Sequence, residues 1–204
     1  MKPQDIKAPY LLYEDIRKFA EDFLGSYNQE DKLPVPIEEI VEIQLKIVII
    51  PAQNIRLILG VDGWLSNDFK NIYVDLDVFD KDKNESRYFF TLAHEIGHYF
   101  LHREIFESLT FSDILEWKKI MYEVPPNEYG WLETHAYNFA GLILVPEHHL
   151  RNEYNEAVSM VSKEGFDRNK HKEIFNDYVS SWLQNKFKVS ARTIEKRIQF
   201  DNLS

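Results

Sequence analysis

The sequence predicts an α+β fold: a mainly helical domain with a small antiparallel sheet of about three strands, packed by one central helix. Three observations predict it. Several segments place apolar residues at helical spacing, three short β-branched or apolar segments lie between residues 46 and 77, and proline or glycine stands at many junctions. The 204 residues are 44% hydrophobic and 28% charged, an ordinary globular balance. We expect one domain over residues 1–150 and a helical extension over residues 151–204 packed on it.

The first half of the chain is predicted to contain two helices and the sheet. Residues 10–27 have apolar side chains at helical spacing, and Pro34 and Pro36 then lead into a second short helix. A polar loop follows the sheet, and Asn84 or Ser86 can cap the next helix. Strands are expected at residues 46–51, 56–66 and 70–77.

The second half is predicted to be helical. Residues 104–130 look less regular, and Pro146 both ends one helix and opens another. Ser190 is placed to cap the last helix. We expect helices at residues 87–102, 131–145, 146–158, 171–187 and 189–199.

Charge and composition restrict the classes of function. The net charge is −10, so the surface repels nucleic acid on average. There is no cysteine, so any metal must be held by histidines and carboxylates. The start does not resemble a signal peptide, and the longest apolar run, Ile47–Ile50, is far shorter than a membrane span. We therefore expect a cytoplasmic protein with no membrane partner.

Residues 90–102 read FTLAHEIGHYFLH and contain the pattern H-E-x-x-H. On a helix, His94 and His98 lie one turn apart on one face and can bind one ion. Glu95 lies at the edge of that face, where it can take a proton from a water activated by the metal. The alternative is a pair of buried histidines satisfied by other groups. Apolar flanks favour the metal, because each unpartnered buried imidazole costs a few kcal/mol.

A catalytic zinc needs a third protein ligand. Distance argues against His102 as that ligand, because it lies ~12 Å along the helix axis from His94. It is better interpreted as a supporting or packing residue. Glu133 and His135 are the candidates on the later helix, and we favour Glu133. The structural alternatives are an acid at a helix N-terminus for Glu133 and an exposed polar residue for His135.

The segments RYFFTLAHEIGHYFLH and ETHAYNFAGLILVP resemble the ImmA/IrrE-type metallopeptidases. The resemblance implies a gluzincin-like site in which Zn²⁺ is held by His94, His98 and Glu133, with Glu95 as general base. It also implies a protein substrate, a helix-turn-helix repressor cleaved to release transcription. His135 and Tyr137 depart from the residues common in the family. The residues left open as stabilisers of the oxyanion are Tyr99, His102, Tyr129, His148 and His149.

The C-terminal segment NKFKVSARTIEKRIQF is basic and looks like a recognition helix of the helix-turn-helix type. We favour a capped amphipathic helix with a solvated basic face over contact with DNA or docking to an acidic repressor surface. Two alternatives to the peptidase remain: a non-proteolytic regulator that binds DNA and keeps the metal for structure, and an interaction protein with a relic site. The basic residues are Lys186, Lys188, Arg192, Lys196 and Arg197.

Overall fold

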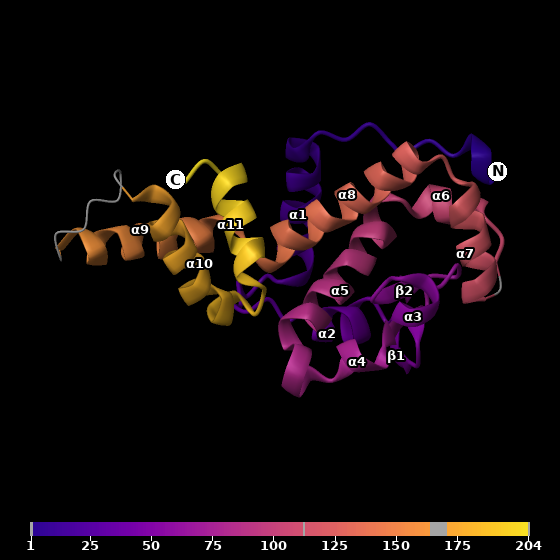
Figure 1. The fold of residues 1–204 in the computed structure, drawn as a ribbon, viewed down its shortest axis with the longest axis horizontal. Coiled ribbons are helices and arrows are strands. Elements are labelled where there is room, and N and C mark those ends of the chain that lie inside the picture. The colour runs from indigo at the N-terminus through magenta and orange to yellow at the C-terminus, as the bar shows by residue number, and fades with distance from the viewer. Residues whose placement is uncertain (1, 112, 164–170, 204) are drawn as a thin grey trace.

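A computed structural model describes residues 2–111, 113–163 and 171–203. Figure 1 shows an elongated molecule in which helices α9, α10 and α11 form one end, while the sheet, α6 and α7 lie toward the other. Helices α5 and α8 cross in the larger part, and they make the most extensive helix–helix contact of the described chain. The predicted α+β class with a mainly helical composition is therefore confirmed.

The N-terminal segments match their predictions. Helix α1 buries Ile16, Ala20 and Phe23 along one face, and it packs against α8. The loop after it contains a cis peptide bond before Pro34. The elements here are a 3-10 turn at Pro3–Asp5, α1 at Tyr13–Tyr27, α2 at Ile37–Glu39 and a π-helical turn at Ile40–Gln44.

The sheet formed by the described residues is mixed, so the expectation of a purely antiparallel sheet is wrong. Its strands are β1 (Val48–Ala52), β2 (Gly63–Leu65) and β3 (Asn71–Asp75), in the order β1-β3-β2. Strands β2 and β3 form an antiparallel hairpin, whereas β1 runs parallel to β3. The parallel pairing follows from the chain path, because α3 and β2 intervene between β1 and β3 and reverse the chain twice.

Helix α3 (Ile55–Leu59) also corrects the predicted second strand. Only the second half of that predicted strand is extended, as β2. The apolar run before Gly60 is too short for periodicity to separate a strand from a helix. Gly60 ends the helix with a φ of 77°, a left-handed conformation that glycine adopts without strain.

The middle of the chain is more helical than predicted. Helices α6 (Arg103–Ser108) and α7 (Ile114–Glu123) occupy the stretch expected to be less regular, and the Asp113 carboxylate caps α7 by accepting from the Leu115 and Glu116 amides.

Helix α4 (Leu76–Phe79) precedes α5 (Lys81–Leu101), which is kinked at Asn84. The Asn84 side chain donates to the Asp77 carbonyl at 2.8 Å rather than capping α5. Helix α8 (Pro126–Leu144) starts five residues before its predicted start, with proline in its first turn.

Helices α5 and α8 cross closely at a glycine. A Cβ on Gly97 would lie 2.8 Å from the Cα of Ala136 and 3.0 Å from its carbonyl oxygen. Only a hydrogen fits there, so the two backbones approach more closely than larger residues would allow. This crossing brings Glu133, about one turn before Ala136, toward the histidines of α5.

The C-terminal helices are α9 (Glu147–Lys163), α10 (Lys172–Phe187) and α11 (Ala191–Phe200). The predicted cap is confirmed, since the Ser190 hydroxyl accepts from the Thr193 amide at 3.2 Å. The proposed boundary at residue 150 stays a prediction, and residues 164–170 of that extension lie outside the described residues. Within the described residues, no helix combines the length and apolar character needed to cross a bilayer.

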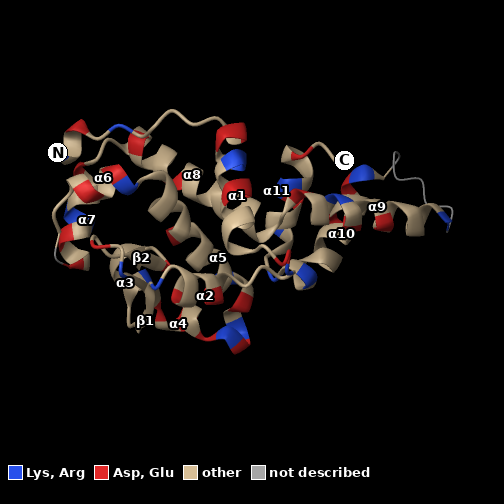
Figure 2. Ribbon diagram, turned by 180° about the vertical axis from the view of Figure 1, so that it is seen from behind, with Lys and Arg blue, Asp and Glu red and all other residues tan. Residues whose placement is uncertain are grey.

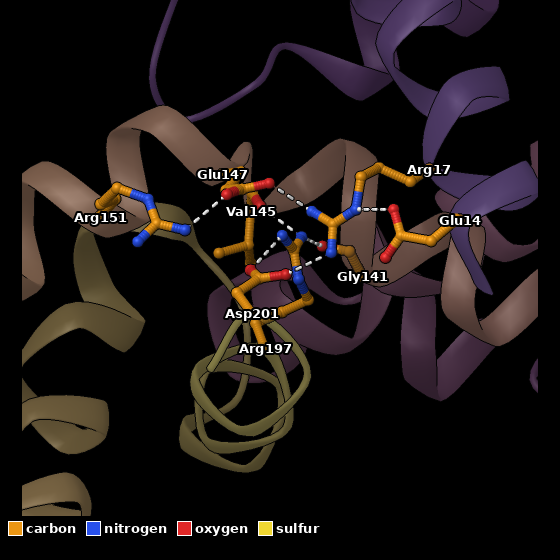
Figure 3. Close-up of polar contacts among 8 residues, drawn as sticks. All are labelled: Glu14, Arg17, Gly141, Val145, Glu147, Arg151, Arg197 and Asp201. Carbon is orange, nitrogen blue, oxygen red and sulfur yellow. Dashed lines mark hydrogen bonds and ion pairs between the residues drawn. The ribbon is translucent and has the colours of Figure 1, made fainter. Parts of the chain in front are cut away.

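A buried network of charges fastens α11 to the end of α8 (Figure 3). Arg197 is buried and donates to the carbonyl of Gly141 at 2.9 Å and to that of Val145. Asp201 accepts from Arg197 at 2.6 Å and from Arg17 of α1 at 2.7 Å. Arg197 therefore satisfies carbonyls at the C-terminus of α8, and it is not available as a surface contact for DNA.

The other basic residues of the tail are mostly engaged as well. Lys186 pairs with Glu153, Lys188 pairs with Glu85 at 2.7 Å, and Lys196 lies 4.3 Å above the Tyr137 ring. Figure 2 shows acidic and basic residues interspersed over α9 to α11. Paired side chains of both signs give a weaker positive field than the sequence of the tail indicates.

Candidate metal centre

Three donor side chains from α5 and α8 converge on one point. His94 Nε2 lies 3.1 Å from His98 Nε2. The Glu133 carboxylate lies 3.3 Å from His94 Nε2 and 3.5 Å from His98 Nε2 through its two oxygens. The predicted third ligand is thus placed beside the two histidines by the crossing of the helices.

These separations fit one tetrahedral ion. Metal–nitrogen and metal–oxygen bonds of roughly 2.1 Å at tetrahedral angles place neighbouring donor atoms roughly 3.4 Å apart. The distance between the two imidazole nitrogens, 3.1 Å, and the shortest distance from each nitrogen to the Glu133 carboxylate, 3.3 and 3.5 Å, lie near that value, although each nitrogen faces a different carboxylate oxygen. Two imidazole nitrogens and one carboxylate oxygen are also the donor types found in catalytic zinc sites that keep one position open.

Glu95 is buried beside this point at the edge strand of the sheet. Strand β2 packs directly on α5 here, because a Cβ on Gly63 would lie 2.6 Å from Thr91 and 3.5 Å from Glu95. Burial raises the pKa of Glu95 above its ordinary value, although His94 and His98 oppose this. A carboxylate with a raised pKa holds a proton more readily than an exposed one, which suits a general base.

Glu133 is held as an anion. Burial alone raises its pKa, but the interactions with His94 and His98 outweigh burial and place the pKa of Glu133 below its ordinary value. The same pairing raises the pKa of His94 against the effect of burial. The carboxylates of Glu95 and Glu133 give this point a negative electrostatic potential, and a negative potential favours binding of a cation.

The centre opens into a cleft of about 360 Å³. Arg87 lies at this cleft paired with Asp62, and Tyr129 lies beside Glu133. The arrangement combines a hydrophilic centre with apolar walls contributed by β2, α5, α6, α7 and α8. The apolar lining includes Trp64, Phe90, Phe106, Trp117, Met121 and Leu132.

The sequence model of the M78 peptidase family, the IrrE N-terminal-like domain, matches residues 78–199. The chain belongs to this family. The match begins at the end of α4 and includes both α5 and α8. No curated protein matched the chain.

Membership of the M78 family makes this a metallopeptidase-type domain, and the family implies a metal ion. The residues present fit such an ion, because His94, His98 and Glu133 supply three donor atoms at compatible distances. The roles of these residues and of Glu95 stay predictions at this point.

His135, the other candidate for the third ligand, lies elsewhere. It is buried rather than exposed, and its Nδ1 lies 3.4 Å from Nε2 of His102. His102 is buried in turn, with its Nδ1 3.0 Å from Nδ1 of His98. His135 therefore lies at the end of a row of imidazoles behind His98, and the expectation that it would be an exposed polar residue is wrong.

Among the five residues left open for stabilising an oxyanion, only Tyr129 lines the cleft. Burial, together with the charge of Glu133 and a hydrogen bond to it, raises the pKa of Tyr129, so its hydroxyl keeps its proton. His102 is 1% exposed and cannot reach a substrate. His148 and His149 lie in a separate cluster with Asp31.

Arg87 and Asp62 line the cleft, although neither of them was predicted from the sequence as a site residue. Arg87 donates to Asp62 at 2.8 Å through Nη2, and both residues line the cleft. The residues are 25 positions apart, so only the fold brings them together. The sequence offered two signals for Arg87: it opens the motif RYFFTLAHEIGHYFLH, and it lies seven residues, or two helical turns, before His94 on α5.

Proposed function

We propose that this protein is a zinc-dependent endopeptidase of the cytoplasm that cleaves a helix-turn-helix transcriptional repressor. The observation that carries the proposal is the convergence of His94, His98 and Glu133 on one point, beside a buried Glu95 and an accessible cleft. A zinc site used only for structure has no need of Glu95 or of a cleft. The resemblance of the two motifs to the ImmA/IrrE-type peptidases supports the choice of a repressor as substrate.

The cleft supports a polypeptide as substrate. Its apolar walls can receive a large apolar side chain, and strand β2 lies at its edge with Gly63 and Trp64 among the lining residues. An edge strand offers free backbone groups that pair with an extended chain. We expect the scissile peptide to lie along β2, with the bond to be cleaved facing His94 and Glu95.

A divalent cation held by His94, His98 and Glu133 would polarise the peptide carbonyl and increase the acidity of a water molecule. Glu95 takes the proton of that water as it attacks the carbonyl carbon. Glu95 then passes the proton to the departing amine, which leaves as the carbon–nitrogen bond breaks. The Tyr129 hydroxyl, which donates to Glu133 in the free protein, turns to donate its hydrogen bond to the carbonyl oxygen as negative charge develops there.

The test compares wild type with Glu95→Gln on a helix-turn-helix repressor encoded beside the gene. Both proteins are assayed for bound metal and for cleavage of the repressor. We expect equal metal content and loss of cleavage in the variant, because Glu95 holds a proton and not the metal. Glu104→Gln is the matched control, since Glu104 is exposed and lies outside the cleft.

Three results would separate the alternatives. Metal retained without cleavage of any candidate repressor by wild type would favour the non-proteolytic regulator. Cleavage that survives in Glu95→Gln would remove Glu95 from the mechanism. Salt-sensitive binding of DNA by wild type that Arg192→Ala weakens would support the tail as a DNA contact.

A further inference from the structure

A second group of potential metal ligands lies outside the cleft. Asp31 is in the loop between α1 and α2, and His148 and His149 are in the first turn of α9. His148 Nε2 lies 2.9 and 3.0 Å from the two carboxylate oxygens of Asp31, and His149 Nε2 lies 3.0 Å from one of them. All the donor atoms lie within 4.8 Å of one another.

The loop that carries Asp31 is fixed by a buried asparagine. The Asn28 side chain donates to the Lys32 carbonyl and accepts from the Lys32 amide, each at 3.1 Å. The Asp31 amide donates to the Asn28 carbonyl at 2.9 Å. The position of Asp31 is therefore set by its loop and does not depend on its contact with the histidines.

The start of α9 is fixed independently. Glu147, directly before the two histidines, pairs with Arg17 of α1 and with Arg151 one turn later, the second contact at 2.6 Å (Figure 3). The charge network of Arg197 and Asp201 secures the preceding end of α8. The loop with Asp31 and the start of α9 with His148 are 117 residues apart in the chain, and each backbone is held by its own contacts. Their side chains therefore meet in a fixed arrangement.

We propose that Asp31, His148 and His149 form a second binding site for a divalent transition-metal cation such as Zn²⁺. Two imidazole nitrogens and one carboxylate oxygen supply three of four tetrahedral positions, and water supplies the fourth. The side chains of Asp31 and His148 are 55% and 57% exposed, and that of His149 is 22% exposed, so an ion can enter from solvent. Each nitrogen–oxygen distance needs to lengthen by about 0.4 Å to reach tetrahedral spacing, and exposed side chains can make this adjustment.

An ion pair without metal is the simpler alternative. As an ion pair it requires a protonated imidazole, whereas neutral imidazoles with the proton on Nε2 donate only ordinary hydrogen bonds to the carboxylate. The two rings lie with centroids 4.2 Å apart, so two positive charges there would repel. A cation instead accepts the lone pairs of both imidazoles and places its charge opposite the carboxylate.

This site is separate from the centre on α5 and α8. Glu133 lies eleven residues before Leu144, the last residue of α8, which corresponds to roughly 16 Å along the helix axis. The second site lies beyond that end of α8. A bound ion would tie the loop after α1 to the start of α9, and α1 itself packs against α8, which α9 follows in the chain.

Titration of the metal-free full chain with zinc tests the proposal through binding stoichiometry. We expect two equivalents in wild type, the second weaker because its ligands are more exposed. Asp31→Ala and His149→Ala should each lose the weaker equivalent and keep the stronger. Glu30→Ala is the matched control, because Glu30 is an exposed carboxylate of the same loop that pairs with Lys32.

A variant lacking His94 and His98 distinguishes the two sites. It should lose the stronger equivalent and keep the weaker, and it should show a zinc-dependent rise in melting temperature that Asp31→Ala abolishes. A single equivalent in wild type would overturn the proposal. A second equivalent that persists unchanged in Asp31→Ala would overturn it as well, whatever the outcome for peptide cleavage.

Discussion

His98 and His102 face each other across one turn of α5, with their Nδ1 atoms 3.0 Å apart. If Nε2 of His98 binds the metal, its Nδ1 carries the proton and donates it to Nδ1 of His102. Nε2 of His102 then donates to Nδ1 of His135, 3.4 Å away. The row of buried imidazoles would therefore fix the tautomer and the orientation of His98, one of the predicted metal ligands.

This relationship predicts different effects for two substitutions of His102. His102→Leu removes the acceptor and should weaken zinc binding about 10–100-fold. His102→Asn should bind zinc nearly as well as wild type, because its Oδ1 lies near the position of the lost Nδ1. Competition with a chromophoric chelator measures the affinity, and imidazole NMR of the metal-free protein reports the tautomer of His98. Equal zinc affinities in the two variants would show that His102 only fills space.

The burial of His102 also predicts a pH dependence of stability. Burial lowers the pKa of His102 to about 2, against an ordinary value of 6.5. Between these values the unfolded chain binds a proton at His102 and the folded chain does not, so acid favours unfolding. From pH 7 to pH 5 this residue should reduce the free energy of unfolding by roughly 2 kcal/mol. Urea unfolding of metal-free wild type and of His102→Asn, each at several pH values, measures this decrease. If the unfolding free energies of the two proteins changed in parallel with pH, the result would contradict the assignment to His102.

The contact of Gly97 with Ala136 predicts that Gly97→Ala is destabilising. The added methyl would lie 2.8 Å from the Cα of Ala136, so α5 and α8 would have to separate. We expect a loss of about 1–3 kcal/mol in unfolding free energy, and weaker zinc binding because Glu133 moves with α8. Gly130→Ala on α8 is the control, since a methyl group there would meet no atom within 4 Å and alanine favours helix. Equal stabilisation by both substitutions would show that the crossing is not tight.

The buried position of Arg197 predicts that Arg197→Ala costs about 1–3 kcal/mol, because Asp201 keeps only Arg17 as a cationic partner and the carbonyls of Gly141 and Val145 lose a donor. Arg192→Ala, on the exposed face of the same helix, should change stability by less than about 0.5 kcal/mol. Chemical denaturation measures both. A small effect of Arg197→Ala would mean that the network of Figure 3 contributes little.

Local rules were sufficient for the parts of the prediction that depend on one helix. The spacing of His94 and His98 follows from the helical period, and Glu133 was favoured over its neighbour His135 as the third ligand. Short apolar runs were the weak point, since the residues of α3 fit a strand as well as a helix. The parallel pairing of β1 with β3 depends on chain path and has no local signal.

Contacts between segments far apart in the chain also could not be predicted from the sequence. Nothing in the residues around His135 indicates that His102, 33 positions earlier, meets it in the core. The same holds for Asp31 and His148, and for the burial of Arg197, whose basic neighbours suggested an exposed face. Each of these depends on tertiary packing, which overrides what charge or propensity indicates locally.

Anomalous diffraction at the zinc edge, from crystals of the zinc-loaded protein, would locate the ion itself. We predict a peak between α5 and α8, with Nε2 of His94, Nε2 of His98 and a carboxylate oxygen of Glu133 each at roughly 2.0–2.2 Å. A peak held only by other groups, or none at these three residues, would contradict the proposed metal centre.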